Sequence, residues 1–263
     1  MSEHPIAARW RALGERGGRR GRALIPYVTA GFPTVGVSRA VLRAVVAAGA
    51  DFVEVGVPFS DPLADGPTIQ RTTQAALEQG MTAAGVLSLI RDAALAVPVV
   101  IMTYLNPVLA YGVERFVADA HAAGAAGLLL TDLPAGADPA VEAAVTRSPL
   151  ALIRLVAPTT DDARLAAALT GAKGFAYLIS RLGVTGARDQ VPADLEQYVR
   201  RVRAATPLPV AVGFGIGTPA QAAAAARYAD GVVVGSALMD AVAQGGVGAA
   251  ERLVRELAAA VHA

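Results

Sequence analysis

The chain has no cysteine and only one lysine among its 263 residues, and both absences exclude kinds of chemistry. Without cysteine there is no disulfide, no thiolate nucleophile and no cysteine-bound metal. The one lysine, Lys173, lies in Gly171–Gly174, which is typical of an exposed turn between a helix and a strand. Schiff-base catalysis needs a lysine amine that faces the substrate, so the sequence argues against it. A P-loop is excluded because no Gly-Lys-Ser/Thr occurs.

Excess charge and long apolar runs are lacking too. The net charge is +1, and the one basic cluster, residues 17–22, has no interleaved aromatic residues, so binding to nucleic acid or a membrane surface is not expected. No apolar run reaches the roughly 18 residues of a membrane helix, and the arginine-rich start lacks the apolar region of a secretion signal. We therefore expect a soluble cytoplasmic protein. No metal site is expected, because His4, His121 and His262 lie far apart without ligand-like neighbours.

Short β-branched runs alternate with alanine-rich helical stretches along the whole chain. The expected strands are Ala23–Ala30, Asp51–Gly56, Val97–Thr103, Ala126–Thr131, Leu150–Val156, Gly174–Ser180, Pro209–Gly213 and Gly231–Gly235. The expected helices are Pro5–Arg16, Val35–Ala48, Thr68–Leu77, Ala83–Ala96, Val113–Ala123, Pro139–Thr146, Asp161–Leu169, Ala193–Ala205, Pro219–Tyr228 and Gly248–Val261.

These strands are apolar almost throughout, which is typical of a parallel sheet covered on both faces. Eight βα units predict an α/β fold consisting of a single (β/α)8 TIM barrel over residues 1–263. Residues 1–22 would form an extra N-terminal helix and a basic connection. A doubly wound open sheet is the alternative, but its dinucleotide fingerprint is missing, since the glycines of Gly213–Gly217 are wrongly spaced for it.

A carboxylate interrupts the second of these strands. Glu54 lies in the apolar run Phe52–Val57, where a charge is costly unless it has a use. The loop that follows is stiffened by prolines and carries Asp61 and Asp65. A carboxylate near the end of a strand, followed by an acidic loop, suits proton transfer beside a polar substrate. The alternative is that Glu54 caps a strand in solvent and the aspartates only form turns.

Glycine-rich loops follow the last three expected strands. They are Gly213–Pro219, Gly235-Ser236 at the start of a short helix, and Ser180–Gly186, a longer polar segment that resembles a lid. In barrels of this type the loops after strands seven and eight commonly hold phosphate, because backbone N–H groups and a helix N-terminus face the anion. Each loop could be only a tight turn, but together they predict a phosphate site.

Other polar side chains are expected near the ends of strands. Tyr177 would lie in the barrel mouth, where its hydroxyl needs a partner such as Glu54. Tyr104, Asn106 and Asp132 are further candidates. For Asn106 in Leu-Asn-Pro and Asp132 in Thr-Asp-Leu-Pro, a local turn-forming role is equally compatible with the sequence.

With these residues in place, the chain closely resembles the α subunit family of tryptophan synthase from about Leu24 to Asp240. The resemblance rests on four segments: Val53–Pro67 (VEVGVPFSDPLADGP), Tyr177–Gly186 (YLISRLGVTG), Gly213–Ile216 and Gly235-Ser236. The family cleaves indole-3-glycerol phosphate to indole and glyceraldehyde 3-phosphate by a retro-aldol reaction, so the resemblance implies a lyase of L-tryptophan biosynthesis.

The resemblance also assigns roles to individual residues. Glu54 would be the catalytic acid and base, Asp65 would accept a hydrogen bond from the indole N–H, and Tyr177 would orient Glu54. The phosphate would be held by Gly186, Gly215, Gly235 and Ser236, and the indole and lid region would comprise Tyr27, Ile69, Met102, Leu129, Thr185 and Phe214. Because the chain has no usable lysine or metal site, the indole ring itself must serve as the electron sink.

The resemblance further implies a partner, the β subunit of tryptophan synthase, in an α2β2 complex with mutual activation. Pyridoxal phosphate would belong to that subunit, and no cofactor is expected in this chain. The loop around Asp61 matches the segment that contacts the β subunit, and residues 181–190 match the lid, although Leu182 is bulkier than expected there and Thr131 precedes Asp132. Three alternatives stay open: a stand-alone lyase, a catalytically silent allosteric barrel, and a different phosphosugar enzyme such as an isomerase.

Overall fold

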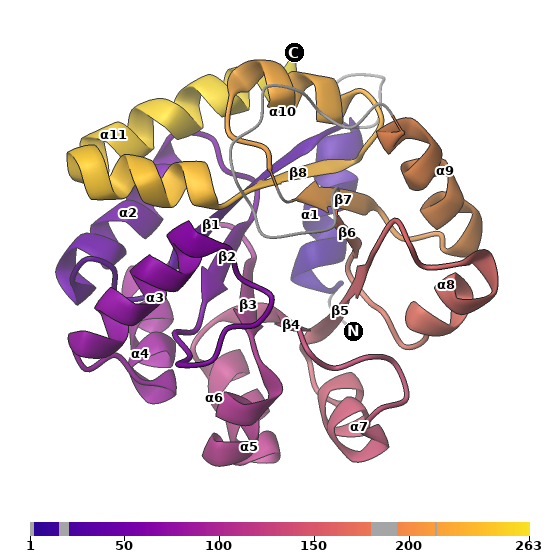
Figure 1. Cartoon of the computed structure of the whole chain (residues 1–263), viewed down its shortest axis with the longest axis horizontal. Coiled ribbons are helices and arrows are strands. Elements are labelled where there is room, and N and C mark those ends of the chain that lie inside the picture. Colours follow the sequence, from indigo (N-terminus) through magenta and orange to yellow (C-terminus); the bar gives the residue numbers. More distant parts are fainter. Residues whose placement is uncertain (1–2, 16–20, 180–193, 214) are drawn as a thin grey trace.

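The chain forms a closed barrel of eight parallel strands, described here from a computed structural model for residues 3–15, 21–179, 194–213 and 215–263. Each strand pairs with the next, and β1 closes the barrel against β8 (Figure 1). The strands are β1 (Ala23–Thr29), β2 (Val53–Gly56), β3 (Val99–Thr103), β4 (Ala125–Leu130), β5 (Ala151–Val156), β6 (Ala176–Ile179), β7 (Val210–Gly213) and β8 (Gly231–Val234). The predicted TIM barrel is confirmed.

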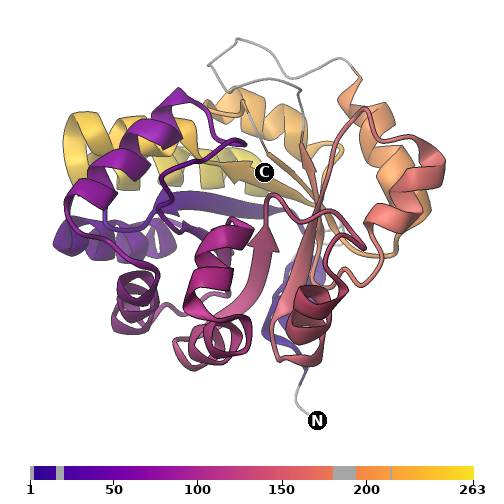
Figure 2. The same ribbon diagram turned by 60° about the horizontal axis from the view of Figure 1, so that its bottom comes forward.

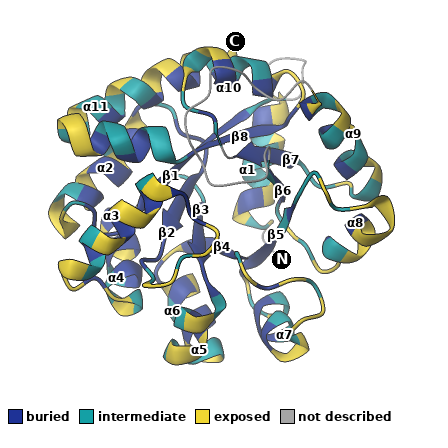
Figure 3. Ribbon diagram, in the orientation of Figure 1, coloured by how far each residue is buried: buried dark blue, intermediate teal, exposed yellow. Residues whose placement is uncertain are grey.

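Helices surround the strands and bury their apolar outer side chains (Figure 3). They are α1 (Pro5–Glu15), α2 (Val35–Ala47), α3 (Pro67–Glu78), α4 (Ala83–Ala93), α5 (Leu105–Tyr111), α6 (Val113–Ala122), α7 (Pro139–Arg147), α8 (Asp162–Ala168), α9 (Leu195–Ala205), α10 (Pro219–Ala226) and α11 (Ser236–His262). All seven residues of β1 are buried, as expected for a strand inside the ring. That the whole chain is one domain stays a prediction.

The extra N-terminal helix, α1, covers the end of the barrel where the strands begin. A Cβ atom added at Gly231, the first residue of β8, would lie 2.9 Å from the Trp10 ring. Trp10 also packs on Phe52, just before β2, with 4.9 Å between ring centroids. Figure 2 shows α1 and the N-terminus below the strands. Because α1 fills this end, a substrate must enter from the other one.

The prediction missed one helix and divided another where the structure bends it. No helix was expected over α5, where Asn106 was weighed as a turn former, but Pro107 lies near the start of this helix, where a proline costs no hydrogen bond. The last helix was expected from Gly248, preceded by a short helix at Ser236. Both segments are present within α11, as two helices joined across a kink with non-helical dihedral angles at Gly245 and Gly246, the latter at φ 60°. Glycine tolerates this left-handed conformation, so the chain bends there.

Candidate active site

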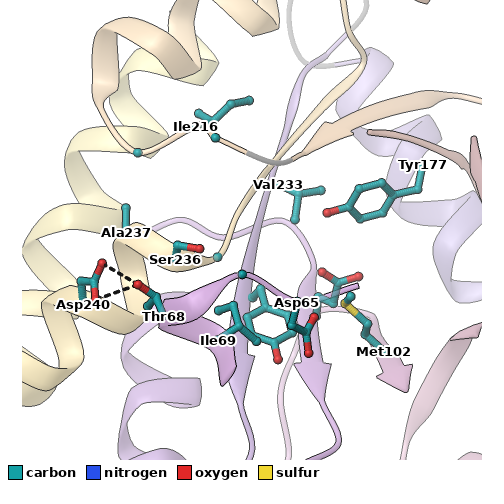
Figure 4. A pocket seen from close by; sticks show the side chains of 16 residues that line it. Asp65, Thr68, Ile69, Met102, Tyr177, Ile216, Val233, Ser236, Ala237 and Asp240 are labelled. Atoms are coloured by element: carbon teal, nitrogen blue, oxygen red, sulfur yellow. Dashed lines mark hydrogen bonds between the residues drawn. The ribbon is translucent and has the colours of Figure 1, made fainter. Parts of the chain in front are cut away.

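A pocket opens at the carboxyl ends of the strands, opposite α1. Its volume is about 820 Å³, including space open to solvent, which suits a ligand of metabolite size. Figure 4 shows the side chains that line it. They come from Tyr27, Glu54, Asp65, Gly66, Thr68, Ile69, Met102, Tyr177, Gly215, Ile216, Gly217, Val233, Gly235, Ser236, Ala237 and Asp240. Nine of the predicted site residues therefore meet in one pocket, although they are scattered along the chain.

Glu54 is the buried carboxyl of this pocket. It lies on β2, level with Tyr27 on β1 and Val100 on β3, and it is 2 % exposed. Among the described residues none donates a hydrogen bond to it. Burial, and after it the charge of the nearby Asp65 carboxyl, together raise the pKa of Glu54 from 4.5 to about 8. Glu54 therefore holds its proton at neutral pH.

Asp65 reaches the same pocket from the loop between β2 and α3. The loop is largely exposed, but Asp65 itself is 8 % exposed, and its carbonyl accepts a hydrogen bond from Gln70 Nε2 (2.8 Å). Burial raises the pKa of Asp65 to about 6, while a hydrogen bond from the Tyr104 hydroxyl lowers it. At neutral pH Asp65 is mostly ionised, so the pocket offers one protonated and one ionised carboxyl.

Tyr27 and Tyr177 point into the barrel mouth because glycines on neighbouring strands leave room for them. A Cβ atom at Gly56 would collide with the Tyr27 hydroxyl, and one at Gly213 would collide with the Tyr177 hydroxyl. Burial, then the charge of Glu54, raises the pKa of Tyr177 well above its ordinary value, so it stays a neutral phenol beside Glu54. Larger residues at these glycines would displace both rings.

The opposite side of the pocket is made by backbone and small side chains. Gly215 has φ +84°, a conformation that favours glycine, and Gly235 and Ser236 lead into the first turn of α11. The Ser236 side chain faces the cavity in Figure 4. A helix N-terminus with small neighbours can receive an anion, because its first N–H groups lack helical partners.

The predicted apolar wall is found in part. Ile69 of α3 and Met102 of β3 line the pocket. Leu129 lies on β4 beside Met102, but it is fully buried and is not among the lining residues, so its part in the wall stays a prediction. Gly186, Thr185 and Phe214 lie outside the described residues, as does the lid expected over residues 181–190.

The remaining candidates have contacts outside the pocket lining. Asp132 Oδ1 accepts a hydrogen bond from the Leu105 N–H (2.7 Å), so it caps the start of α5, 27 positions away, and its role as a local turn former stays a prediction. Asn106 lies within α5 and does not line the pocket. Tyr104 Oη accepts a hydrogen bond from the Ala64 N–H (2.9 Å), so it contacts the loop that carries Asp65.

Sequence reasoning missed several pocket residues, notably Thr68, Val233, Ala237 and Asp240. Asp240 follows Ser236 by one helical turn, and this spacing was a usable signal once a helix was expected at Ser236. Thr68 opens α3, but nothing in the sequence brings it to Asp240, since that contact joins residues 172 positions apart.

Within the described ranges, no cluster of three or more His, Asp or Glu residues could hold a metal ion. Lys173 lies in an exposed turn, as predicted, and its Nζ donates to the Thr146 carbonyl (2.9 Å). The helices of the same ranges include none that is long and apolar enough to cross a membrane. The described pocket itself presents two buried carboxyls, Glu54 and Asp65, with Tyr27 and Tyr177 beside them.

Comparisons with known proteins point to one family. The family model described as tryptophan synthase alpha chain matches residues 15–262. The tryptophan synthase alpha chain of Acidiphilium cryptum is 49% identical over 243 residues, which cover 91% of this chain and 87% of that one. That of Gluconacetobacter diazotrophicus is 48% identical over 264 residues, covering 97% and 95%.

Solved structures agree. Tryptophan synthase from Mycobacterium tuberculosis matches with a TM-score of 0.88 and 43% identity, covering 98% of this chain and 97% of that one. Tryptophan synthase subunit alpha from Legionella pneumophila matches with a TM-score of 0.90 and 33% identity, covering 99% of both. The chain belongs to the tryptophan synthase alpha chain family, and it is a lyase of L-tryptophan biosynthesis that cleaves indole-3-glycerol phosphate to indole and glyceraldehyde 3-phosphate.

Proposed function

We propose that Glu54 is the acid and base of this retro-aldol cleavage. Its protonated carboxyl gives a proton to indole C3, which turns the ring into an electron-accepting indolenine. The resulting carboxylate then takes the proton of the glycerol hydroxyl next to the ring, while the bond between C3 and that carbon breaks. The electron pair returns to the ring, the hydroxyl becomes the aldehyde, and Glu54 ends protonated again. The observation that carries the proposal is a buried Glu54 with a pKa near 8 in the pocket.

Asp65 and Tyr177 assist this step. The ionised carboxyl of Asp65 accepts a hydrogen bond from the indole N–H and stabilises the positive charge that develops on the ring. Two carboxyls with pKa values near 8 and 6 support this division of roles, because one must carry the proton and the other must not. Tyr177 acts as a neutral neighbour that orients Glu54.

Binding is assigned to the rest of the pocket. Gly215, Gly235 and Ser236 hold the phosphate, and the side chains of Tyr27, Ile69 and Met102 contact the indole. Leu129, Thr185, Gly186 and Phe214 are proposed to complete these two subsites. Support comes from the distribution of the lining residues: Ser236 and Ala237 lie at the start of α11, and Asp65 with Met102 lies across the pocket (Figure 4).

The chain is also proposed to work with a tryptophan synthase β subunit in an α2β2 complex in the cytoplasm. Pyridoxal phosphate would belong to that partner, and this chain would need no cofactor of its own. The neighbouring structures are described as tryptophan synthase, which supports a partner. The loop after β2 offers a docking surface, since Asp61 is exposed and Leu63 is 93 % exposed.

The test is a steady-state assay of indole release from indole-3-glycerol phosphate, with and without purified β subunit. Cleavage that rises when the β subunit is added supports the whole proposal. Cleavage without any activation would favour a stand-alone lyase. No cleavage in either assay would favour a silent allosteric barrel, or an isomerase if a simple sugar phosphate is turned over instead.

A further inference from the structure

The charges around the pocket are unbalanced for a ligand that carries phosphate. Three of the described lining residues are acidic, namely Glu54, Asp65 and Asp240, and no lysine, arginine or histidine is among them. Glu54 is protonated at neutral pH, but Asp240 belongs to the helix whose first turn would receive the phosphate. A carboxylate in that position opposes a dianion.

Asp240 is held by two residues of α3, the helix beside α11. Thr68 Oγ1 donates to both carboxylate oxygens of Asp240, at 3.3 and 3.2 Å, as the dashed lines in Figure 4 show. Arg71 Nη2 donates to Oδ1 of the same carboxylate at 2.7 Å. Thr68 and Arg71 are three positions apart, so one face of α3 supplies both donors. These bonds fix the carboxylate one turn beyond Ser236.

Among the described residues, Arg71 is therefore the positively charged side chain that pairs with a residue lining the pocket, Asp240. Its side chain is 58% exposed and that of Asp240 is 40% exposed, so water and salt reach the pair. An exposed ion pair adds little to folding stability. The sign of its charge still matters to an anion bound one helical turn away, because charges at this separation still interact at a site that water and salt reach.

We infer that the Arg71–Asp240 pair sets the affinity of the pocket for the phosphate group, with Arg71 offsetting a carboxylate that would otherwise repel it. This inference rests on the proposed phosphate site at Gly235 and Ser236. Arg71 acts through Asp240 and is a positioning residue, not a catalytic one. The two residues have opposite effects: loss of Arg71 exposes the phosphate to a bare carboxylate, whereas loss of the Asp240 charge removes the repulsion.

The test is calorimetric titration of the chain with glycerol 3-phosphate at low and high salt. At low salt Arg71→Gln is expected to weaken binding by about three- to tenfold, and Asp240→Asn is expected to bind at least as tightly as the wild type. The double variant should recover at least wild-type affinity, which a merely structural loss would not do. The effect of Arg71→Gln should shrink at high salt.

Arg255→Gln is the matched control, because Arg255 makes an exposed ion pair with Glu251 in the second half of α11, far along the helix from Ser236. It should leave the affinity unchanged. Unaltered binding by Arg71→Gln, or a double variant as weak as Arg71→Gln, would overturn the inference alone. A wild-type chain that does not bind glycerol 3-phosphate would overturn the proposed phosphate site as well.

Discussion

Asp51 and Glu54 lie three residues apart, each 2 % exposed, but at opposite ends of the barrel they have opposite surroundings. Asp51 accepts hydrogen bonds from the Leu24 N–H (2.9 Å) and from Arg9 (2.6 Å), and His262 Nε2 lies 2.8 Å from it. Glu54 has no such donor among the described residues, and its pKa is near 8. A buried carboxyl that accepts hydrogen bonds from several donors links the strands and helices that carry them. A buried carboxyl without such donors keeps its proton available for chemistry.

Asp230 shows that the pairing at the closed end is general. It precedes β8 and accepts hydrogen bonds from the Val210 N–H and from Arg203, both at 2.8 Å. Asp51 and Asp230 thus each join the start of a neighbouring strand to a basic side chain. The comparison predicts that substitutions at the closed end change stability, while those at the open end change activity.

The largest expected effect is on catalysis. Glu54→Gln removes the proton donor and acceptor, so the rate of indole release should fall by about 10²- to 10⁴-fold. Glu78→Gln, at an exposed position of α3, is the control and should retain the wild-type rate. A Glu54→Gln chain with near-normal turnover in the indole assay would end the proposed role of Glu54.

Asp51→Asn tests the other end of the barrel. It leaves Arg9 without its charged partner at a buried site, so the free energy of unfolding should fall by about 3 kcal/mol. Urea denaturation measures this loss. The kcat should stay within about twofold of the wild type, because Asp51 lies at the closed end of the barrel, away from the pocket. A large drop in kcat of the folded variant would contradict the assignment of stability to the closed end and activity to the open end.

Glu54 should also make the fold less stable as the pH rises. Between pH 4.5 and about 8 the folded chain keeps a proton that the unfolded chain releases, so stability falls across this window. Raising the pH from 4 to 7.5 should therefore cost the wild type about 4 kcal/mol of stability that Glu54→Gln does not lose. Parallel pH dependences in urea titrations of the two proteins would contradict a raised pKa.

The smallest effect is expected at Tyr104. Tyr104→Phe removes the hydroxyl that lowers the pKa of Asp65, so Asp65 should ionise at higher pH and kcat/KM at pH 6 should drop about threefold. Tyr111→Phe is a matched control, since Tyr111 donates to the carboxylate of Asp119 (2.7 Å) outside the pocket. An acidic limb of the pH profile that stays in place in Tyr104→Phe would rule out this influence.

The barrel and its main carboxyls could be predicted because each has a local signal. In β2 the charged residue Glu54 stands within a short apolar run, and prolines and a glycine mark the loop that carries Asp65. α5 was not predicted, because the contact that caps its start comes from Asp132, which follows β4 and lies 27 positions away. The pairing of Asp240 with Thr68 and Arg71 depends on how α3 packs against α11, and no local pattern specifies such a contact.

The most direct test of the contrast between the two ends is an infrared titration of the carboxyl groups, recorded as the difference between the wild type and Glu54→Gln. The account predicts one protonated carboxyl band that disappears with a midpoint near pH 8 and is missing from the variant. A difference spectrum in which the Glu54 band disappears near pH 4.5 would contradict the account, because Glu54 could then not hold a proton for catalysis at neutral pH.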